Sequence, residues 1–363
     1  MKFGLAGGGT GGHVYPALAV AEHLREPGDS LLYYGTEKGP ERRLAQQRGI
    51  EFRPVPAAQV RVRKPWLLAR GLYQLWNGTR AARRLLQEDR PAAVFATGGY
   101  AAAPVGRAAR QEGIPLIVFL PDARPGWAVR FLARYATTVA CAVDAATTSL
   151  PAGKTVVTGY PVRPEFALAT REEGIARFNL DPALPTILIA GGSLGAHSIN
   201  VAVARALPQW LQDAQVIHVS GRDEESWLEE ERDRLSASAR SRYHLFGYTD
   251  EMPWAMAASD LAVMRAGAST LGELPIAGLP VVSIPGAFSD QAVNAEYLAS
   301  HGAAVHLPAD RIAELETLVM ALVHDPARRE EMARAMRALA RPDAAAHIAS
   351  IVRQAAGVQE AAA

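Results

Sequence analysis

The chain has 363 residues, a length that favours two domains, each able to bury its own core. Its formal net charge of +1 disfavours a wholesale nucleic-acid binder, so any charged partner must be met by a local patch. Cys141 is the only cysteine, which rules out an intramolecular disulfide, and no apolar run is long enough for a spanning helix. We therefore expect a cytoplasmic protein, with attachment to a membrane surface left open.

Short β-rich runs alternate with helical patterns through the first half of the chain. We expect strands at residues 2–6, 30–35, 92–97, 115–120 and 137–142. This alternation, which continues to Val157, is typical of a doubly wound parallel sheet. The segment TGYPVRPEF (158–166) holds two prolines and a glycine, and it is the expected domain linker.

The alternation restarts after this linker. Further strands are expected at residues 186–190, 216–220, 243–248, 260–265, 280–285 and 303–307. The predicted fold class is α/β, with two Rossmann-like doubly wound parallel-sheet domains whose ligand-binding edges face a central cleft. We expect domains at 1–160 and 161–340, and a helical tail at 341–363 that either packs back onto the first domain or frays.

The stretch AGGGTGGHVYPALAVAEHL follows the first strand and opens a helix. Gly7, Gly9 and Gly12 satisfy the G-x-G-x-x-G dinucleotide fingerprint, although this match alone is weak. His13 stands where a P-loop needs lysine, which disfavours nucleoside triphosphate hydrolysis. The acid that a dinucleotide site requires would be Glu37, which comes late but does not exclude that interpretation.

Both interpretations share one physical basis. Glycines let backbone N–H groups approach an anion, and Pro16 in the first turn starts a helix whose N-terminus carries about half a positive charge. The loop therefore predicts a phosphate or diphosphate site. The alternatives are that the glycines serve only tight strand-to-helix packing, and that His13 is a packing or capping residue.

The segment from residue 65 to 86 predicts a helix with two different faces. At about 100° per residue, one stripe is apolar and expected in the core, and it consists of Leu68, Leu72, Leu75, Ala82 and Leu86. The opposite side combines aromatic and basic residues, as expected of a surface that lies on an anionic bilayer: Trp66, Arg70, Tyr73, Arg80 and Arg84. The alternative is a basic helix that holds two aromatics by chance or packs against another subunit.

The stretch DLAVMRAGASTLGE carries the richest polar pattern of the second half. A strand ends at Arg265, and Ser269 and Thr270 are expected as N-caps of the next helix, whose N-terminus then points at the cleft. Glu273, one turn in, could bind a diol such as ribose. Its alternative role is that of a capping-box glutamate.

Two amides follow at helical spacing. Gln291 and Asn294 lie three residues apart and share one helical face. Side-chain amides offer both donors and acceptors, which suits sugar hydroxyls. The alternative is an ordinary solvated start of a helix.

Six motifs, in order and at matching spacing over nearly the whole chain, carry a family resemblance. They are GGGTGGHVYPALAVAEHL, ATGGYAAAPV, TGYPVRPEF, GGSLGAHSIN, GYTDEMPWAMAASDLAVMRAGASTLGELPIAGLPVVSIP and DQAVNAEYL. Together they resemble the UDP-N-acetylglucosamine:lipid I N-acetylglucosaminyltransferases of peptidoglycan synthesis, the MurG family. The resemblance implies a GT-B fold and inverting transfer of GlcNAc from UDP-GlcNAc to the 4-hydroxyl of the MurNAc unit of undecaprenyl-linked lipid I, which forms lipid II.

The resemblance also assigns residues. It places the uracil at the backbone of Thr249 with Arg265 near the base, and the ribose at Glu273. It assigns the donor diphosphate to Ser193, Arg163 and the amides of Ala268, Ser269 and Thr270, a binding segment that continues through Leu271 and Gly272. The amides that read the GlcNAc hydroxyls would be Gln291 and Asn294. The residues at the reaction centre or the acceptor would be Thr10, Gly11, Gly12, His13 and Tyr100.

The chain departs from the family around the acceptor and the sugar. Leu120, Pro121 and Asp122 stand where Glu-Gln-Asn is usual. Tyr160 replaces the usual Asn of the linker, and Asp290 precedes Gln291 where His is common. These changes leave the prediction of UDP binding intact and concern the acceptor in particular.

Two residues are candidates for the general base. We favour His13 because it belongs to the motif that the chain keeps, with Asp122 orienting the acceptor or the histidine. Asp122 could itself take the proton, or it could be an exposed loop acid between Pro121 and Pro125.

The remaining expectations concern partners and rival functions. We expect no metal and no cofactor, no nucleic acid, an anionic inner-membrane surface on its cytoplasmic side, and proteins of cell-wall synthesis and division. The alternative functions are a glycosyltransferase for diacylglycerol or another lipid, an inactive UDP-sugar-binding homologue, and a dehydrogenase on a doubled Rossmann scaffold.

Overall fold

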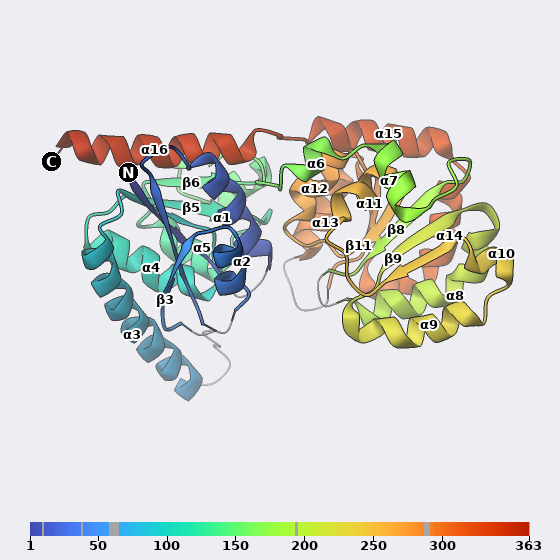
Figure 1. The fold of residues 1–363 in the computed structure, drawn as a ribbon, viewed down its shortest axis with the longest axis horizontal. Coiled ribbons are helices and arrows are strands. Elements are labelled where there is room, and N and C mark those ends of the chain that lie inside the picture. Colours follow the sequence, from blue (N-terminus) through green and yellow to red (C-terminus); the bar gives the residue numbers. More distant parts are fainter. Residues whose placement is uncertain (9–10, 38, 58–64, 193–194, 287–290, 363) are drawn as a thin grey trace. The chain divides into compact units, whose positions relative to one another are not determined.

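The computed structural model describes residues 1–8, 11–37, 39–57, 65–192, 195–286 and 291–362. The chain forms two compact units. Unit 1 comprises Met1–Arg163 and Pro342–Ala363, and unit 2 comprises Pro164–Arg341. Each unit is built on its own parallel sheet (Figure 1).

The sheet of unit 1 has seven parallel strands in the order β3-β2-β1-β4-β5-β6-β7. Their bounds are β1 Lys2–Ala6, β2 Ser30–Gly35, β3 Glu51–Pro54, β4 Ala93–Ala96, β5 Leu116–Leu120, β6 Thr138–Cys141 and β7 Thr155–Val157. Ala6 at the end of β1 pairs with Tyr34 of β2 and Ala96 of β4. The order reverses between β1 and β4, so the loops after these two strands lie at the switch point where such sheets bind ligands.

The edge strands β3 and β7 are additions to the strands expected from the sequence. β3 reads EFRP and none of its residues is fully buried, while β7 is only three residues long. An edge strand is covered less than a central one, so its sequence lacks the continuous apolar run that marks β5, LIVFL. Pro54 fits at an edge because a ladder hydrogen bond is missing there anyway.

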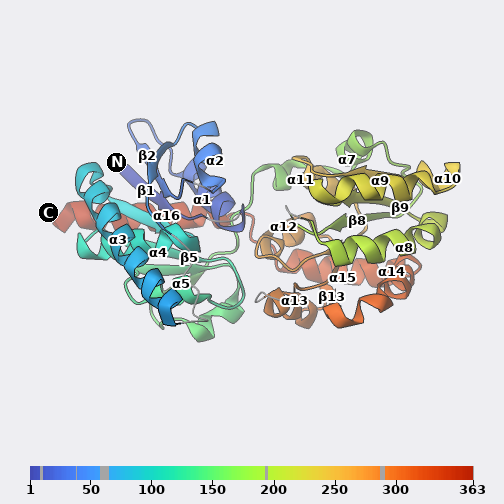
Figure 2. The same ribbon diagram turned by 90° about the horizontal axis from the view of Figure 1, so that it is seen from below.

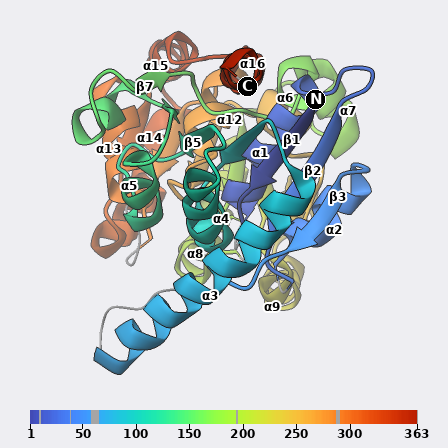
Figure 3. The same ribbon diagram turned by 90° about the vertical axis from the view of Figure 1, so that its left-hand side faces the viewer.

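Helices cover both faces of the unit 1 sheet (Figures 2 and 3). One face carries three helices side by side, namely α3 Pro65–Asp89, α4 Gly99–Gln111 and α5 Trp127–Ala133. The other carries α1 Gly11–His23, α2 Glu41–Gln47 and α16 Ala344–Ala362. A 3₁₀ helix, η1, spans Asp144–Ser149.

Helix α16 belongs to unit 1 although it follows unit 2 in the chain (Figure 1). It packs on α1, and Arg353 fixes it to the turn after that helix. The Arg353 guanidinium donates to the carbonyl oxygen of Leu24 at 2.8 Å and to Asp29 Oδ2 at 2.6 Å, and it lies 5.2 Å from the ring centre of Phe3. Asp29 also pairs with the terminal ammonium of Met1, so this carboxylate joins both ends of unit 1.

The sheet of unit 2 has six parallel strands in the order β10-β9-β8-β11-β12-β13. Their bounds are β8 Thr186–Ala190, β9 Gln215–Val219, β10 Tyr243–Phe246, β11 Leu261–Met264, β12 Val281–Ser283 and β13 Ala304–His306. Here the order reverses between β8 and β11, which places a second switch point at the loops after these strands.

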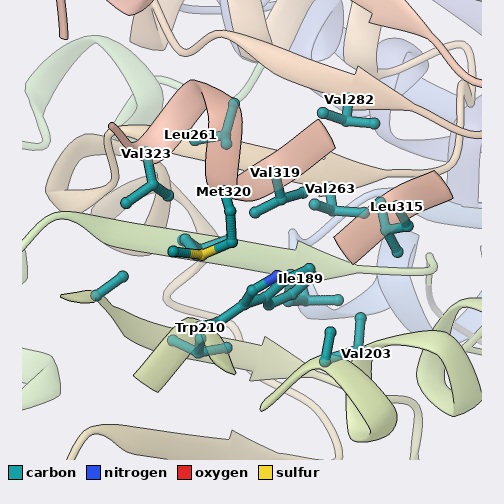
Figure 4. Packing of buried hydrophobic residues seen from close by; sticks show 14 of the residues in the cluster. Ile189, Val203, Trp210, Leu261, Val263, Val282, Leu315, Val319, Met320 and Val323 are labelled. Carbon is teal, nitrogen blue, oxygen red and sulfur yellow. The ribbon is translucent and has the colours of Figure 1, made fainter. Parts of the chain in front are cut away.

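The helices of unit 2 are α6 Glu165–Leu168, α7 Arg171–Phe178, α8 His197–Asp213, α9 Glu225–Asp233, α10 Ala237–Arg240, α11 Met252–Ala258, α12 Thr270–Ala277, α13 Gln291–Ser300, α14 Leu315–Val323 and α15 Pro326–Ala338. Two 3₁₀ helices span Arg222–Glu224 and Ala309–Glu314. Trp210 of α8 and Val319 of α14 pack with Ile189 and Val263 of the sheet in an apolar core, where all four are fully buried (Figure 4). This core fixes the strands whose ends carry the candidate site. In the described part of the chain, no helix combines the length and apolarity needed to cross a bilayer.

Candidate active site

The first glycine loop leads directly into α1. This helix begins at Gly11, so the expectation that Pro16 lies in its first turn is wrong; Pro16 lies inside the helix. Gly11 and Gly12 thus belong to the helix itself. Thr10 lies outside the described residues.

His13 is held from two sides by Thr97, which follows β4. The Thr97 hydroxyl donates to the His13 carbonyl oxygen at 2.5 Å, and the His13 ring Nδ1 lies 2.9 Å from the Thr97 carbonyl oxygen. A carbonyl oxygen only accepts, so we assign the proton of the neutral imidazole to Nδ1. The lone pair is then on Nε2, which can accept a proton.

Gly98 makes room for this imidazole. It has φ of +93°, and a Cβ added there would lie 3.1 Å from His13 Nδ1. Burial lowers the pKa of His13 below its ordinary value, against the opposing effects of the Asp122 charge and the bond to Thr97. The neutral, basic form of His13 therefore predominates at pH 7.

Asp122 follows β5 and interacts electrostatically with His13. Its side chain is half-buried, which disagrees with the alternative that it is merely an exposed loop acid. A carboxylate beside an imidazole stabilises the imidazolium that forms when the ring takes up a proton. The structure thus brings together the two residues that the sequence analysis offered as rival bases.

A buried acid that the sequence analysis missed lies beneath the loop. Glu41 is fully buried and its Oε1 accepts from the Thr36 amide at 2.9 Å and the Thr36 hydroxyl at 2.6 Å. A Cβ at Gly8 or Gly39 would lie 2.4 or 1.9 Å from this carboxylate. The glycines therefore also serve close packing.

Glu37 is the acid that a dinucleotide site would have used to bind a ribose. It is exposed on the turn after β2, while the buried acid of the same turn is Glu41, which Thr36 engages. The turn therefore offers no support for the dinucleotide interpretation. The close approach of Gly8 and Gly39 to Glu41 exists only in the folded chain, so no pattern in the sequence marked this acid.

In unit 2, Arg265 joins the ends of two strands to a helix. Its Nη1 donates to the carbonyl oxygens of Ile284 and Pro285, at 3.3 and 2.9 Å, and its Nη2 donates to Ser198 Oγ at 3.2 Å. Partial burial lowers the pKa of this guanidinium from its usual value, but arginine remains charged at neutral pH. A cation thus lies at the switch point of the unit 2 sheet.

The start of α12 differs from the expected capping. Ser269 occupies the N-cap position but makes no side-chain cap bond; its hydroxyl donates to Glu273 Oε2 at 3.0 Å. The Thr270 hydroxyl and amide both donate to the Gly267 carbonyl oxygen, at 2.6 and 3.1 Å. The expectation for Ser269 is thus met in position but not in bonding, and Thr270 is the first residue of the helix and not its cap.

The same turn determines which amides can meet an anion. Among the described residues, the N–H groups of Ala268 and Ser269 have no acceptor, whereas that of Thr270 is already bonded. Leu271 donates its amide to Ala268 and Gly272 donates its amide to Ser269, at 3.2 and 3.0 Å. Anion binding at this helix end would rest on two amides and not on the whole segment.

The two amide side chains of α13 have different surroundings. Gln291 is half-buried and its Oε1 accepts from the Gly286 amide at 2.8 Å. Asn294 is fully buried and its Nδ2 donates to the Ala266 carbonyl oxygen at 3.1 Å. Asn294 thus holds the turn before α12, and we keep the role of reading hydroxyls for Gln291 alone.

The remaining candidates divide between the units. Thr249 is half-buried in unit 2, where its hydroxyl accepts from the Glu251 amide at 3.0 Å. Arg163 lies in unit 1, with its guanidinium 5.9 Å from the ring centre of Tyr15. Ser193 and Asp290 lie outside the described residues, as do the side chains of Tyr100, Trp66 and Arg70.

Helix α3 presents the expected two faces over its described part. Of the predicted apolar stripe, Ala82 and Leu86 are buried, Leu75 is only half-buried, and the side chains of Leu68 and Leu72 lie outside the described residues. Tyr73, Arg80 and Arg84 are exposed. Trp76, absent from the predicted set, joins them: it is 49% exposed, and the Arg80 guanidinium lies 4.8 Å from its ring centre. On α5, Trp127 is 52% exposed and stacks on Phe131 at 5.5 Å.

Comparison with known proteins identifies the family. The N- and C-terminal domain models of glycosyltransferase family 28 match residues 3–141 and 186–348. A UDP-N-acetylglucosamine–N-acetylmuramyl-(pentapeptide) pyrophosphoryl-undecaprenol N-acetylglucosamine transferase of Roseiflexus sp. (strain RS-1) is 40% identical over 97% of this chain and 94% of its own. A relative of the same name from Acidothermus cellulolyticus is 39% identical over 99% of both chains. The crystal structure of Acinetobacter baumannii MurG matches with a TM-score of 0.78 at 29% identity, covering 97% of this chain and 99% of that one. The chain belongs to glycosyltransferase family 28 and, within it, to the UDP-N-acetylglucosamine–N-acetylmuramyl-(pentapeptide) pyrophosphoryl-undecaprenol N-acetylglucosamine transferases.

Proposed function

We propose that this protein transfers GlcNAc from UDP-GlcNAc to the 4-hydroxyl of the MurNAc unit of undecaprenyl-pyrophosphoryl-MurNAc-peptide, with inversion at the anomeric carbon. Relatives that carry the name of this reaction match over nearly their whole length. The observation that carries the proposal is the imidazole of His13, whose Nδ1 faces the Thr97 carbonyl oxygen and whose Nε2 is left to accept a proton.

In the chemical step one bond forms, one bond breaks and one proton is transferred. The acceptor oxygen bonds to the anomeric carbon of GlcNAc while the bond from that carbon to the diphosphate breaks and UDP leaves. His13 Nε2 takes the hydroxyl proton, and the charge of Asp122 stabilises the resulting imidazolium.

Unit 2 would bind the donor. The free amides of Ala268 and Ser269 at the start of α12 suit the diphosphate, where negative charge grows as UDP leaves. Glu273 would take the ribose and Gln291 the sugar hydroxyls, with Arg265 near the base. Arg163, which the family resemblance assigns to the diphosphate, belongs to unit 1.

The exposed faces of α3 and α5 would lie on the cytoplasmic face of an anionic membrane, where a lipid-linked acceptor resides. Both faces present aromatic rings beside arginines, Trp76 with Arg80 and Trp127 with the exposed Arg130. Aromatic side chains favour the headgroup region, and each arginine near an anionic surface adds about 1 kcal/mol of attraction.

A transfer assay tests this function directly. The full chain is incubated with radiolabelled UDP-GlcNAc and either a lipid I analogue or diacylglycerol, and the lipid products are separated. We expect labelled disaccharide lipid only from the lipid I analogue, and its rate of formation should fall at least about a hundredfold with His13→Ala. Labelled diacylglycerol would establish a different acceptor, and UDP-GlcNAc binding without any product would establish an inactive homologue.

A further inference from the structure

A proline inside α1 leaves one backbone carbonyl without its helical partner. In an α-helix, the carbonyl oxygen of residue i accepts from the amide of residue i+4. The partner of Gly12 would be residue 16, which is Pro16 and has no N–H. The Gly12 carbonyl therefore needs another donor, because an unpaired polar group in a half-buried residue costs free energy.

Tyr160 supplies that donor from the far end of unit 1. Its hydroxyl donates to the Gly12 carbonyl oxygen at 3.2 Å. The Tyr160 ring is 3% exposed and meets Phe119 of β5 edge to face, with 5.8 Å between the ring centres. Packing fixes the ring, so the hydroxyl is presented in one place.

The bond to Gly12 acts on His13 through one peptide plane. The Gly12 carbonyl and the His13 amide belong to the same rigid unit, so holding one fixes the other. The opposite side of His13 is held by Thr97, which bonds both its carbonyl oxygen and its ring Nδ1. Arg163, three residues after Tyr160, lies over the ring of Tyr15, so the linker follows the start of α1.

We propose that Tyr160 is a positioning residue for the reaction: its hydroxyl replaces the hydrogen bond that Pro16 removes from α1 and so fixes the direction in which His13 presents Nε2. The inference deepens the proposed function and rests on it for the role of His13. It gives a role in the reaction to Tyr160, which stands where the family usually has asparagine.

Tyr160→Phe removes the hydroxyl and keeps the ring against Phe119. We expect kcat to fall about three- to tenfold, the range of one neutral hydrogen bond, while KM for UDP-GlcNAc stays unchanged. Tyr34→Phe is the matched control, because Tyr34 is a buried tyrosine of the same unit whose hydroxyl donates to Asp89 Oδ2 at 3.0 Å. It should lose at least as much thermal stability, because its acceptor is a carboxylate, and it should keep its kcat.

Pro16→Ala provides the decisive background. It restores an N–H that can donate to the Gly12 carbonyl oxygen, so adding Tyr160→Phe should then cost less than about twofold in kcat. If Tyr160→Phe lowers kcat by the same factor in the wild-type chain and in the Pro16→Ala variant, the inference is overturned. The hydroxyl would then act independently of the missing helical hydrogen bond. An unchanged kcat in Tyr160→Phe alone would overturn it as well.

A second readout does not depend on transfer activity. The His13 imidazole is followed by NMR over pH, with its signals assigned from their absence in His13→Gln. In Tyr160→Phe we expect the pKa of His13 to move up towards its ordinary value as the ring becomes more hydrated, with no change in Tyr34→Phe. An unshifted titration would contradict the inference, whereas a wild-type chain inactive on lipid I would contradict the proposed function alone.

Discussion

Replacing His13 and Asp122 one at a time separates the two candidate bases. His13→Ala removes Nε2, the atom proposed to take the hydroxyl proton. Asp122→Asn keeps that atom and the shape of the side chain, and removes only the negative charge that acts on the imidazole. The two losses therefore measure different things, the proton acceptor itself and the stabilisation of its charged form.

The expected magnitudes follow from these two roles. A positioned general base contributes about 10² to 10⁴ to the rate, so His13→Ala should lower the chemical rate at least about a hundredfold. A single charge acting on an imidazolium in partly hydrated surroundings is worth about 1 to 2 kcal/mol, so Asp122→Asn should cost roughly five- to thirtyfold. Donor affinity should remain nearly intact in both variants, because the donor is assigned to unit 2.

The pH profile gives a second signature. The neutral imidazole is the base, so the rate rises with pH as His13 loses its proton. Burial already lowers the pKa of His13, and Asp122 opposes that effect. Asp122→Asn should therefore lower the pKa further and move the acid limb of the profile to lower pH.

Rapid-quench single turnovers with UDP-GlcNAc and a lipid I analogue, from pH 5 to 8, measure the rate without the influence of product release. A larger loss in Asp122→Asn than in His13→Ala would refute the reasoning and make Asp122 the base. Mild losses of rate in both variants would show that water, and neither side chain, takes the proton of the acceptor hydroxyl.

Four further outcomes are expected. Gln291→Ala should impair use of UDP-GlcNAc while UDP still binds, whereas Glu273→Ala should weaken the binding of UDP itself, each by roughly 1 to 3 kcal/mol. Equal losses of UDP affinity in the two variants, measured by calorimetry, would disprove the assignment. Charge reversal at Arg80 and Arg84 should weaken co-sedimentation of the protein with anionic vesicles and leave its binding to neutral vesicles unchanged. Unchanged binding to anionic vesicles would show that this face of α3 does not contact the membrane. Transfer should persist in excess chelator, and a loss that only Mg²⁺ or Mn²⁺ restores would show a metal requirement. Arg353→Met should lower the free energy of unfolding in urea by about 1.5 to 3 kcal/mol, the value of hydrogen bonds to charged groups; a change below about 0.5 kcal/mol would show that α16 is held by packing alone.

The central strands could be predicted from the sequence because they are buried on both faces. β5 and β8 read LIVFL and TILIA, all buried, and such continuous runs mark parallel sheets. The edge strands β3 and β7 could not, because partial exposure weakens the pattern that identifies a strand. The start of α1 was predicted too late, since Pro16 suggested a first turn that the preceding glycines had already formed.

The site could be predicted where it follows a local motif and not where it depends on distant contacts. His13 and Asp122 were predicted from their motifs and the departures within them. Thr97 is 84 residues from His13, and Tyr160 is 148 residues from Gly12, so no pattern along the chain links them. At the start of α12 the contact is local, since the Ser269 hydroxyl donates to Glu273 Oε2 four residues further on.

The order in which the ribosome delivers the chain has a consequence for α16. Unit 2 is one uninterrupted segment and can fold once it has emerged, whereas unit 1 lacks the helix that covers α1 until residues 342–363 appear. At about 5 to 20 residues per second, synthesis of the intervening 180 or so residues takes roughly 10 to 40 s. During that time the apolar side of α1 is uncovered on the nascent chain, where it can bind chaperones or neighbouring chains. Completion of unit 1 therefore waits until α16 has been synthesised.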